Sequence, residues 1–255
     1  MRTIFVGDLH GCIDEALELL DKCQATSSDW VILLGDLVDR GRDSAACVDL
    51  AMRLDARQGK PACVMGNHEE RALDYEMLAQ RGHLDLDKMN PEHRRTRLQL
   101  QPKHYDYLKR LPLYIRVPEH DIVAVHAGCY PGRLIEQQTE RHLMHIQSIS
   151  PPNEKSMWPS RVPEGERDKW PFWSTLWTGP ERVVFGHSVL DRPLVTDKVV
   201  GIDGGACFGR ELWAFIAPDD RIVRVKGRAK PDEDDRDRKR RARLIPIHGD
   251  VSAFS

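Results

Sequence analysis

Three short loops with metal-type side chains occur within the first 69 residues, and this pattern constrains the fold more than any other feature. They read Gly7-Asp8-Leu9-His10-Gly11, Gly35-Asp36-Leu37-Val38-Asp39-Arg40-Gly41 and Gly66-Asn67-His68-Glu69. Each follows a short apolar run (4–6, 31–34 and 62–65) that ends at a glycine before Asp or Asn, which is typical of a buried parallel strand stopping at a turn. Because ligands bind beyond the carboxyl ends of such strands, we expect the three loops to meet at one sheet edge.

The segments between these runs have the periodicity of helices. Apolar residues recur at helical spacing over 13–23 and 44–54, so the chain begins by alternating strand and helix. Residues 70–81 also predict a helix. The polar, basic stretch 84–110 predicts a helical excursion that acts as a lid or a covering helix pair.

The second half predicts strands with short connections. Their predicted ranges are 121–126, 182–187, 199–202, 212–216 and 222–225. Two of them end in a histidine, His126 and His187. Turn-like connections this short favour mixed or antiparallel pairing, so we expect an α/β protein in which two mixed β-sheets pack as a sandwich flanked by helices.

A chain of 255 residues suits one domain, which we assign to residues 1–227. Within it, 131–180 predicts an irregular insertion rich in proline and tryptophan (Trp158, Trp170, Trp173, Trp177). These tryptophans either pack the insertion onto the core or stack on a nucleobase, and packing is favoured. Residues 228–255 predict a tail, solvated because its acidic and then basic runs cannot build a core.

Composition excludes several classes of function. The formal net charge of −2 gives no global attraction to nucleic acid or to an anionic membrane. Six scattered cysteines without a Cys-x-x-Cys pair favour reduced thiols and therefore a cytoplasmic protein. No stretch approaches the ~18 apolar residues of a membrane span, and the chain starts directly in a strand, so we expect neither membrane insertion nor export.

Six side chains that follow predicted strands are candidate metal ligands: Asp8, His10, Asp36, Asn67, His126 and His187. Oxygen and imidazole donors without thiolate suit Mn²⁺, Fe²⁺ or Zn²⁺. Six such ligands suffice for two divalent ions if one carboxylate bridges them, and Asp36 is the natural bridge. We expect two divalent metal ions as cofactors, with manganese first and iron or zinc as alternatives.

In combination, the three loops and the strand-terminal histidines resemble the phosphoprotein phosphatase family of calcineurin-like metallophosphoesterases, over roughly residues 3–216. The resemblance implies that fold, with one metal on Asp8, His10 and Asp36. It implies a second metal on Asp36, Asn67, His126 and His187. It further implies a hydrolase that attacks phosphoric esters or anhydrides directly with a metal-bridging hydroxide, without a covalent intermediate.

The same resemblance implies roles for the remaining loop residues. His68 protonates the leaving oxygen and Asp39 holds it in the required tautomer, while Arg40 contacts the phosphoryl oxygens. Arg40, Asn67 and Arg182 are the candidate substrate contacts, Arg182 from its charge alone. Seven further histidines have no ligand pattern and are interpreted as surface or packing residues: His83, His93, His104, His120, His142, His145 and His248.

The segments 125–132, 176–180, 184–187 and 202–209 are most similar to the bacterial diadenosine tetraphosphatase (ApaH-like) branch of that family. Gln147 stands where we expect an arginine in the nucleotide-cleaving relatives. The leading substrates are therefore dinucleoside polyphosphates such as diadenosine tetraphosphate, with phosphoserine and phosphothreonine on proteins as the alternative. A non-catalytic binding scaffold is disfavoured because every ligand is present. Nucleic acid is expected only as a capped RNA substrate. Symmetric versus asymmetric cleavage and the oligomeric state stay open.

Overall fold

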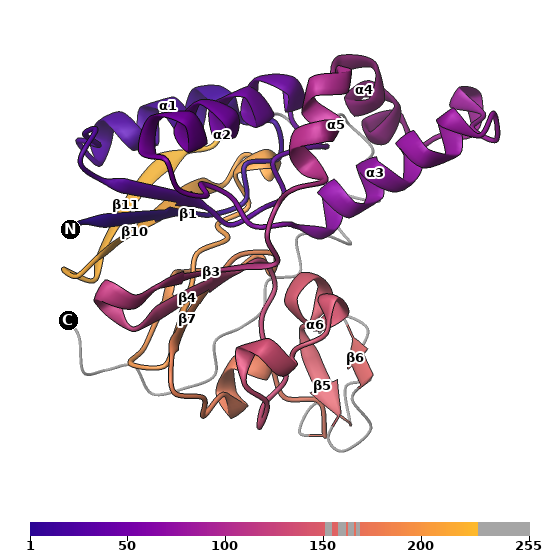
Figure 1. Cartoon of the computed structure of the whole chain (residues 1–255). Coiled ribbons are helices and arrows are strands. Elements are labelled where there is room, and N and C mark those ends of the chain that lie inside the picture. The colour runs from indigo at the N-terminus through magenta and orange to yellow at the C-terminus, as the bar shows by residue number, and fades with distance from the viewer. Residues whose placement is uncertain (151–154, 158–161, 163–165, 167–168, 229–255) are drawn as a thin grey trace.

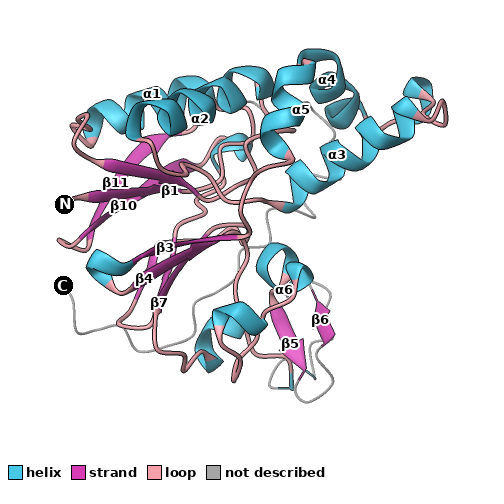
Figure 2. Ribbon diagram, in the orientation of Figure 1, coloured by secondary structure: helices cyan, strands magenta, loops and turns pink. Residues whose placement is uncertain are grey.

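The computed structural model describes residues 1–150, 155–157, 162, 166 and 169–228. Two β-sheets face each other, and helices cover the outer side of the first sheet (Figure 1). Figure 2 shows that long helices gather on that side, whereas short helices and loops surround the second sheet. The α/β sandwich expected from the sequence is confirmed.

The first sheet joins the two ends of the chain. Its strand order is β11 (Arg221–Lys226), β10 (Glu211–Ala217), β1 (Thr3–Val6) and β2 (Trp30–Leu33). β1 and β2 are parallel, whereas β10 is antiparallel to both β1 and β11. The parallel pair sends the loops after β1 and β2 to the same edge.

The prediction of a third strand at 62–65 is wrong. This run is reduced to an isolated bridge between Leu33 and Cys63. The Leu33 amide donates to Ala62 O (2.7 Å) and the Val64 amide donates to Leu33 O (3.2 Å). The Met65 amide then donates to Pro112 O instead, so the run leaves the sheet after two hydrogen bonds.

The second sheet is mixed, as expected. Its strand order is β3 (Tyr114–Val117), β4 (Ile122–Val125), β7 (Arg182–Phe185), β9 (Val199–Gly201) and β8 (Leu194–Val195). The pairs β4·β7 and β7·β9 are parallel, and the two outer pairs are antiparallel. Parallel β4 and β7 bring the histidines that follow them to one edge. The two outer strands of this sheet, β3 and β8, were not predicted from the sequence.

The core lies between the sheets and continues under the helices. Alternate residues of β1 separate because successive side chains in a strand point to opposite faces. Phe5 packs between the sheets with Phe185 and Phe215, whereas Ile4 and Val6 pack under the helices. Both layers are closed to solvent, which leaves the sheet edge as the place where polar loop side chains meet.

The predicted helices are present. Those of the first half are α1 (Ile13–Lys22), α2 (Ser44–Gln58), α3 (Asn67–Gln80), η1 (Leu86–Lys88), α4 (Pro91–Gln99) and α5 (Pro102–Leu108). The excursion at 84–110 is thus a helix pair, and α4 and α5 pack with α2 and α3. Short 3₁₀ helices follow at η2 (Pro118–His120) and later at η7 (Ala206–Phe208).

The segment 131–180 has more regular structure than expected. It contains η3 (Ile135–Gln137), α6 (Glu140–His145), β5 (Ser148–Ser150), β6 (Lys155–Met157) and η6 (Trp173–Leu176). Trp173 and Trp177 are buried in the core between the sheets, which confirms packing rather than base stacking for these two. Trp158 and the predicted tail beyond residue 228 lie outside the described residues.

All six cysteines are buried as free thiols. No helix in the described part of the chain combines the length and the apolarity that a membrane crossing requires.

Candidate functional site

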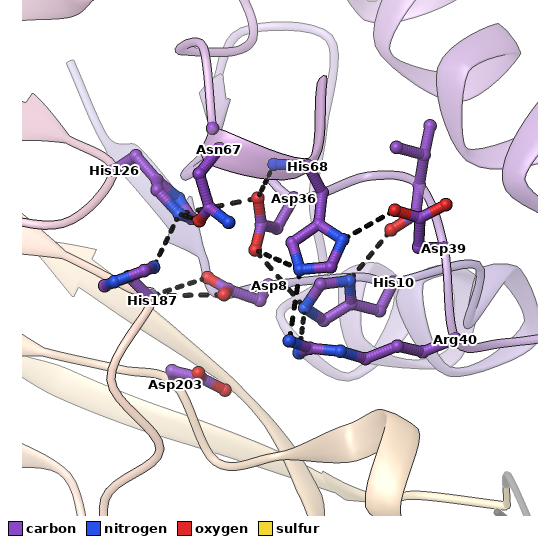
Figure 3. A network of polar contacts seen from close by, with 12 residues as sticks. Asp8, His10, Asp36, Asp39, Arg40, Asn67, His68, His126, His187 and Asp203 are labelled. Atoms are coloured by element: carbon purple, nitrogen blue, oxygen red, sulfur yellow. Dashed lines mark hydrogen bonds and ion pairs between the residues drawn. The ribbon is translucent and has the colours of Figure 1, made fainter. Parts of the chain in front are cut away.

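The ends of four strands and the start of one helix deliver the expected ligands to one place, and Figure 3 shows them gathered around Asp36. Asp36 Oδ2 lies 3.3 Å from His10 Nε2, and Asp36 Oδ1 lies 3.4 Å from His126 Nε2. His126 Nε2 also lies 3.0 Å from Asn67 Oδ1 and 3.1 Å from His187 Nδ1. The two oxygens of one carboxylate therefore face two different groups of donors.

Asp8 joins the cluster through the backbone of the last ligand. The His187 amide donates to both oxygens of Asp8, at 3.0 and 3.1 Å. Gly186 permits this approach, because a Cβ at that position would overlap Asp8 Oδ1. Gly66 has the same function beside Asp36, where a Cβ would lie 2.5 Å from both the amide nitrogen and Oδ1. These two glycines are needed for close packing of backbone against carboxylate.

Backbone strain is concentrated at this site. Among the residues that the structure describes, eight non-glycine residues have positive φ, and five of them are His10, Asp36, Asp39, Arg40 and His187. Such conformations cost about 1–3 kcal/mol each and persist where the surroundings fix them, typically in active sites. The strain thus marks the same residues that the loop patterns single out.

The orientation of two imidazoles is fixed by backbone carbonyls. His10 Nδ1 donates to Val38 O (2.8 Å), and His126 Nδ1 donates to Leu34 O (2.7 Å). A carbonyl oxygen only accepts, so each Nδ1 carries the proton and each neutral ring presents an Nε2 lone pair. Each Nε2 lies within 3.4 Å of an Asp36 oxygen. A cation between them would bind both atoms, and a carbonyl that holds Nδ1 is a common way to orient histidine ligands around metals.

Electrostatics at the site also favour a cation. Burial lowers the pKa values of His10, His126 and His187, which keeps these rings neutral. Burial together with Asp203 and Asp36 raises the pKa of Asp8 well above its usual range. For Asp36, burial opposes ionisation, but the neighbouring imidazoles and Arg40 hold its pKa well below the usual range.

Among the described residues, three sets of donor atoms are close enough together to hold an ion: His10, Asp36 and His68; Asp36, His126 and His187; and Asp39, His68 and His93. The atoms of each set lie within 4.8 Å of one another, and Asp36 belongs to the first two sets. The residues therefore fit divalent metal ions of the borderline kind that accept oxygen and imidazole donors.

His68 lies on the side of Asp36 opposite His126 and His187, and it is held by Asp39 (Figure 3). His68 Nδ1 donates to Asp39 Oδ2 (2.6 Å), and His68 Nε2 lies 3.1 Å from Arg40 Nη2. Arg40 Nη1 also contacts His10 Nε2. This arrangement places His68 Nε2 beside the guanidinium of Arg40.

Sequence reasoning missed three buried residues at this site. Glu69 accepts hydrogen bonds from the amides of Asp36, Leu37, Val38 and Gly66. Asp203 lies next to the cluster, and burial raises its pKa to about 6. His93 donates from Nδ1 to Asp39 Oδ2 (2.9 Å), a contact with the site that its interpretation as a surface or packing residue did not include. The signal for His93 was its place on one helix face with Thr96 and Gln99.

Arg182 is not at the site. It begins β7, at the opposite end of that strand from His187, and its Nη1 pairs with Asp220 Oδ1 at 2.7 Å. Its guanidinium also stacks on Phe215. The expected substrate contact is therefore wrong, because charge alone says nothing about which end of a strand a residue occupies. Gln147 is 2% exposed, and its side-chain amide finds no hydrogen-bond partner among the described residues.

Comparison with known proteins agrees with this geometry. Residues 1–206 match the calcineurin-like phosphoesterase family. The chain belongs to this family. Over 89% of its length it is 26% identical to the asymmetrical bis(5'-nucleosyl)-tetraphosphatase PrpE of Oceanobacillus iheyensis, of which the match covers 93%. A symmetrical bis(5'-nucleosyl)-tetraphosphatase of Shewanella oneidensis is 36% identical, but over 58% of this chain and 52% of its own.

Other relatives point to more than one substrate class. Serine/threonine-protein phosphatase 1 of Salmonella typhimurium is 29% identical over 81% of this chain and 88% of its own. Among solved structures, a protein assigned as a diadenosine tetraphosphatase superposes with a TM-score of 0.72 at 28% identity, covering 89% of this chain and 93% of its own. As a member of this family, the chain is a metallophosphoesterase, a phosphohydrolase whose family uses divalent metal ions.

Proposed function

We propose that this enzyme hydrolyses dinucleoside polyphosphates such as diadenosine tetraphosphate, with two divalent ions, manganese first, that share Asp36. The observation that carries the proposal is the position of Asp36, whose two oxygens face different histidines and which belongs to two donor sets. The first ion would be held by Asp8, His10 and Asp36, and the second by Asp36, Asn67, His126 and His187. When bound, the ions would activate water and neutralise charge on the phosphoryl oxygens.

The side chains of this protein supply the remaining chemistry. Arg40 would donate hydrogen bonds to the phosphoryl oxygens as negative charge accumulates on them. His68, protonated on both ring nitrogens, would keep its Nδ1 proton on Asp39 and give its Nε2 proton to the leaving oxygen, which leaves a neutral ring. Asn67 would contact the substrate next to the second ion. Water attacks directly, so no covalent intermediate forms on the protein.

The choice of substrate rests on the relatives that match along most of the chain. The PrpE relatives cover at least 89% of it and are named as asymmetrical tetraphosphatases. A serine/threonine protein phosphatase is the second candidate, because the Salmonella relative also matches most of the chain. Capped RNA is a further test substrate, since it contains the same kind of phosphoric anhydride. We further propose that the enzyme acts in the cytoplasm, where its six buried thiols stay reduced.

The test compares substrates on one metal-loaded preparation. Manganese-loaded protein is incubated with diadenosine tetraphosphate, a phosphoserine peptide, a capped RNA and 4-nitrophenyl phosphate, and the products are resolved by chromatography. We expect the highest kcat/KM for diadenosine tetraphosphate. ATP plus AMP would identify asymmetric cleavage, and ADP alone symmetric cleavage. A higher kcat/KM for the phosphopeptide would overturn the substrate assignment, and no turnover of any substrate would overturn the catalytic proposal.

A further inference from the structure

Helix α4 holds the turn that carries Asp39 and Arg40. His93 Nδ1 donates to Asp39 Oδ2 (2.9 Å), and Arg95 Nη2 donates to Arg40 O (3.0 Å). Two further α4 side chains, Thr96 and Gln99, hold the residues just after the turn. All four come from one nine-residue helix, so the helical excursion supports the site directly.

The contacts of Thr96 and Gln99 meet at Ser44. Thr96 Oγ1 lies 3.1 Å from Ser44 Oγ, which accepts the amide proton of Asp39 at 3.0 Å. Gln99 Oε1 accepts the Ser44 amide (2.9 Å), and Gln99 Nε2 donates to Arg42 O (2.8 Å). Side chains of α4 therefore fix both ends of the loop 39–44.

The turn needs this support because its backbone is strained. Asp39 and Arg40 are consecutive non-glycine residues with φ of 69° and 63°, in the left-handed region. Strained conformations of this kind persist only where the surrounding structure holds them. Removal of α4 contacts would let the turn relax and would move the Asp39 carboxylate away from His68.

We propose that His93 is a positioning residue that aligns the proton donor His68 through Asp39, which rests on the function proposed above for His68. Asp39 Oδ2 accepts hydrogen bonds from two imidazoles, His68 Nδ1 at 2.6 Å and His93 Nδ1 at 2.9 Å. The carboxylate only accepts, so both rings carry their proton on Nδ1. Two donors from different helices fix the rotation of the carboxylate, and this fixes the ring of His68 with Nε2 facing Arg40.

The surroundings of His93 leave it little freedom. It is 8% exposed, and its ring lies 5.5 Å from that of Tyr75 between ring centroids. A cavity of about 10 Å³ beside it, lined in part by Asp39 and Thr96, has space for about one water molecule. Burial opposes ionisation of Asp39, but the hydrogen bonds and the electrostatic effect of His68 and His93 together hold its pKa well below the usual range. His93 thus contacts Asp39 and acts on the reaction through it.

The experiment compares His93→Leu with His93→Asn. Asparagine can present an N–H close to the position of Nδ1, whereas leucine has no donor. The matched control is His104→Leu, which removes another buried histidine beside a carboxylate, since His104 Nε2 lies 3.2 Å from Asp49 Oδ1 on the neighbouring helix. Each manganese-loaded variant is assayed for kcat and KM on two substrates. Phenyl phosphate releases phenolate, a poor leaving group that needs protonation, whereas 4-nitrophenyl phosphate releases 4-nitrophenolate, which leaves with little help from a proton.

We expect His93→Leu to lower kcat on phenyl phosphate by about 10- to 100-fold, the range for outer residues that orient an active-site ligand. The loss on 4-nitrophenyl phosphate should be smaller, with KM unchanged on both. His93→Asn should regain most of the lost kcat, and His104→Leu should leave kcat unchanged. In a His68→Asn background, His93→Leu should cause no further loss.

Several results would overturn the inference while the wild-type enzyme is active. Equal losses on both aryl phosphates, or a His93→Leu enzyme as active as His104→Leu, would show that His93 is only structural. If His93→Leu does not fold, His93→Gln, which displaces the amide by one methylene, is compared with His93→Asn in the same assays, and equal kcat values would overturn it. A wild-type enzyme inactive on every phosphoester would instead overturn the proposed function itself.

Discussion

The two sides of Asp36 are built differently. On one side, His126 and His187 follow strands of the second sheet, and backbone carbonyls and amides fix the position of these residues. On the other side, His68 and Asp39 depend on side chains that come from α4. A sheet edge therefore positions the ligand side, whereas side chains of helix α4 position the proton-donor side. Binding of metal and transfer of a proton should thus be separable by mutation.

The largest effect should come from the residue that both sides share. Asp36→Asn removes the only charge on the bridging group and should lower kcat/KM by more than about 10³-fold, because loss of one transition-state stabiliser already costs on the order of 10²–10³. The bound metal, measured by elemental analysis after gel filtration, should fall below that of the wild type. Asp49→Asn, at the surface beside α5, is the control. Wild-type metal content in Asp36→Asn would refute the shared-ligand role.

The next effect isolates the proton-donor side. His68→Asn should lower turnover by about 10²–10⁴, the usual contribution of a general acid, while both metals stay bound. Turnover of diadenosine tetraphosphate and metal content are measured on the same sample. Loss of metal in this variant would show that His68 is a ligand, as its place in two of the donor sets would also permit.

A smaller effect is expected from a substitution in helix α4, which tests the support that this helix gives to the loop 39–44. Thr96→Val keeps the shape of this buried side chain but removes its contact with Ser44 Oγ, at a cost of about 0.5–1.5 kcal/mol in the free energy of unfolding. Calorimetry should show a fall in Tm of about 2–4 °C per kcal/mol in a domain of this size. An unchanged Tm would mean that the contact between Thr96 and Ser44 does not stabilise the loop 39–44.

The last prediction concerns Asp29, which lies outside both sides of the site, and it serves as a reference because it should leave activity unchanged. Hydrogen bonds from Arg2 hold the pKa of Asp29 at about 2, against a usual 3.8. Because the folded pKa is lowered, its stabilisation of about 1 kcal/mol is present above pH 3.8 and is lost as the pH falls through about 2. Urea unfolding of the wild type and of Asp29→Asn should therefore differ at pH 6 and converge as the pH falls below 3.8. A difference independent of pH would contradict this account, and activity at pH 7 should be the same.

The ligand side could be predicted from the sequence because its signals are local. A strand that ends in Gly-Asp or in histidine places its own side chain at the sheet edge, so Asp8, His10, Asp36, His126 and His187 followed from short patterns. The run at 62–65 resembled a strand for the same reason. Its pairing ends early because Met65 finds Pro112, about 50 residues later, and no local pattern announces that partner.

The partners of the helix side could not be predicted, because they come from distant segments. His93 meets Asp39 across 54 residues of sequence, and the spacing of His93, Thr96 and Gln99 indicates a polar helix face but not what that face contacts. The pairing of β10 with β1 is likewise non-local. Arg182 was predicted as a substrate contact because of its charge, but it lies at the end of β7 opposite His187 and pairs with Asp220.

The central claim is that two ions share Asp36. The most direct measurement is a crystal structure of the manganese-soaked enzyme with anomalous scattering recorded at the manganese edge. The account predicts two anomalous peaks about 3.5–4 Å apart, as in two-metal hydrolases, with Asp36 in contact with both. A single peak, or two peaks of which one has no contact with Asp36, would contradict it.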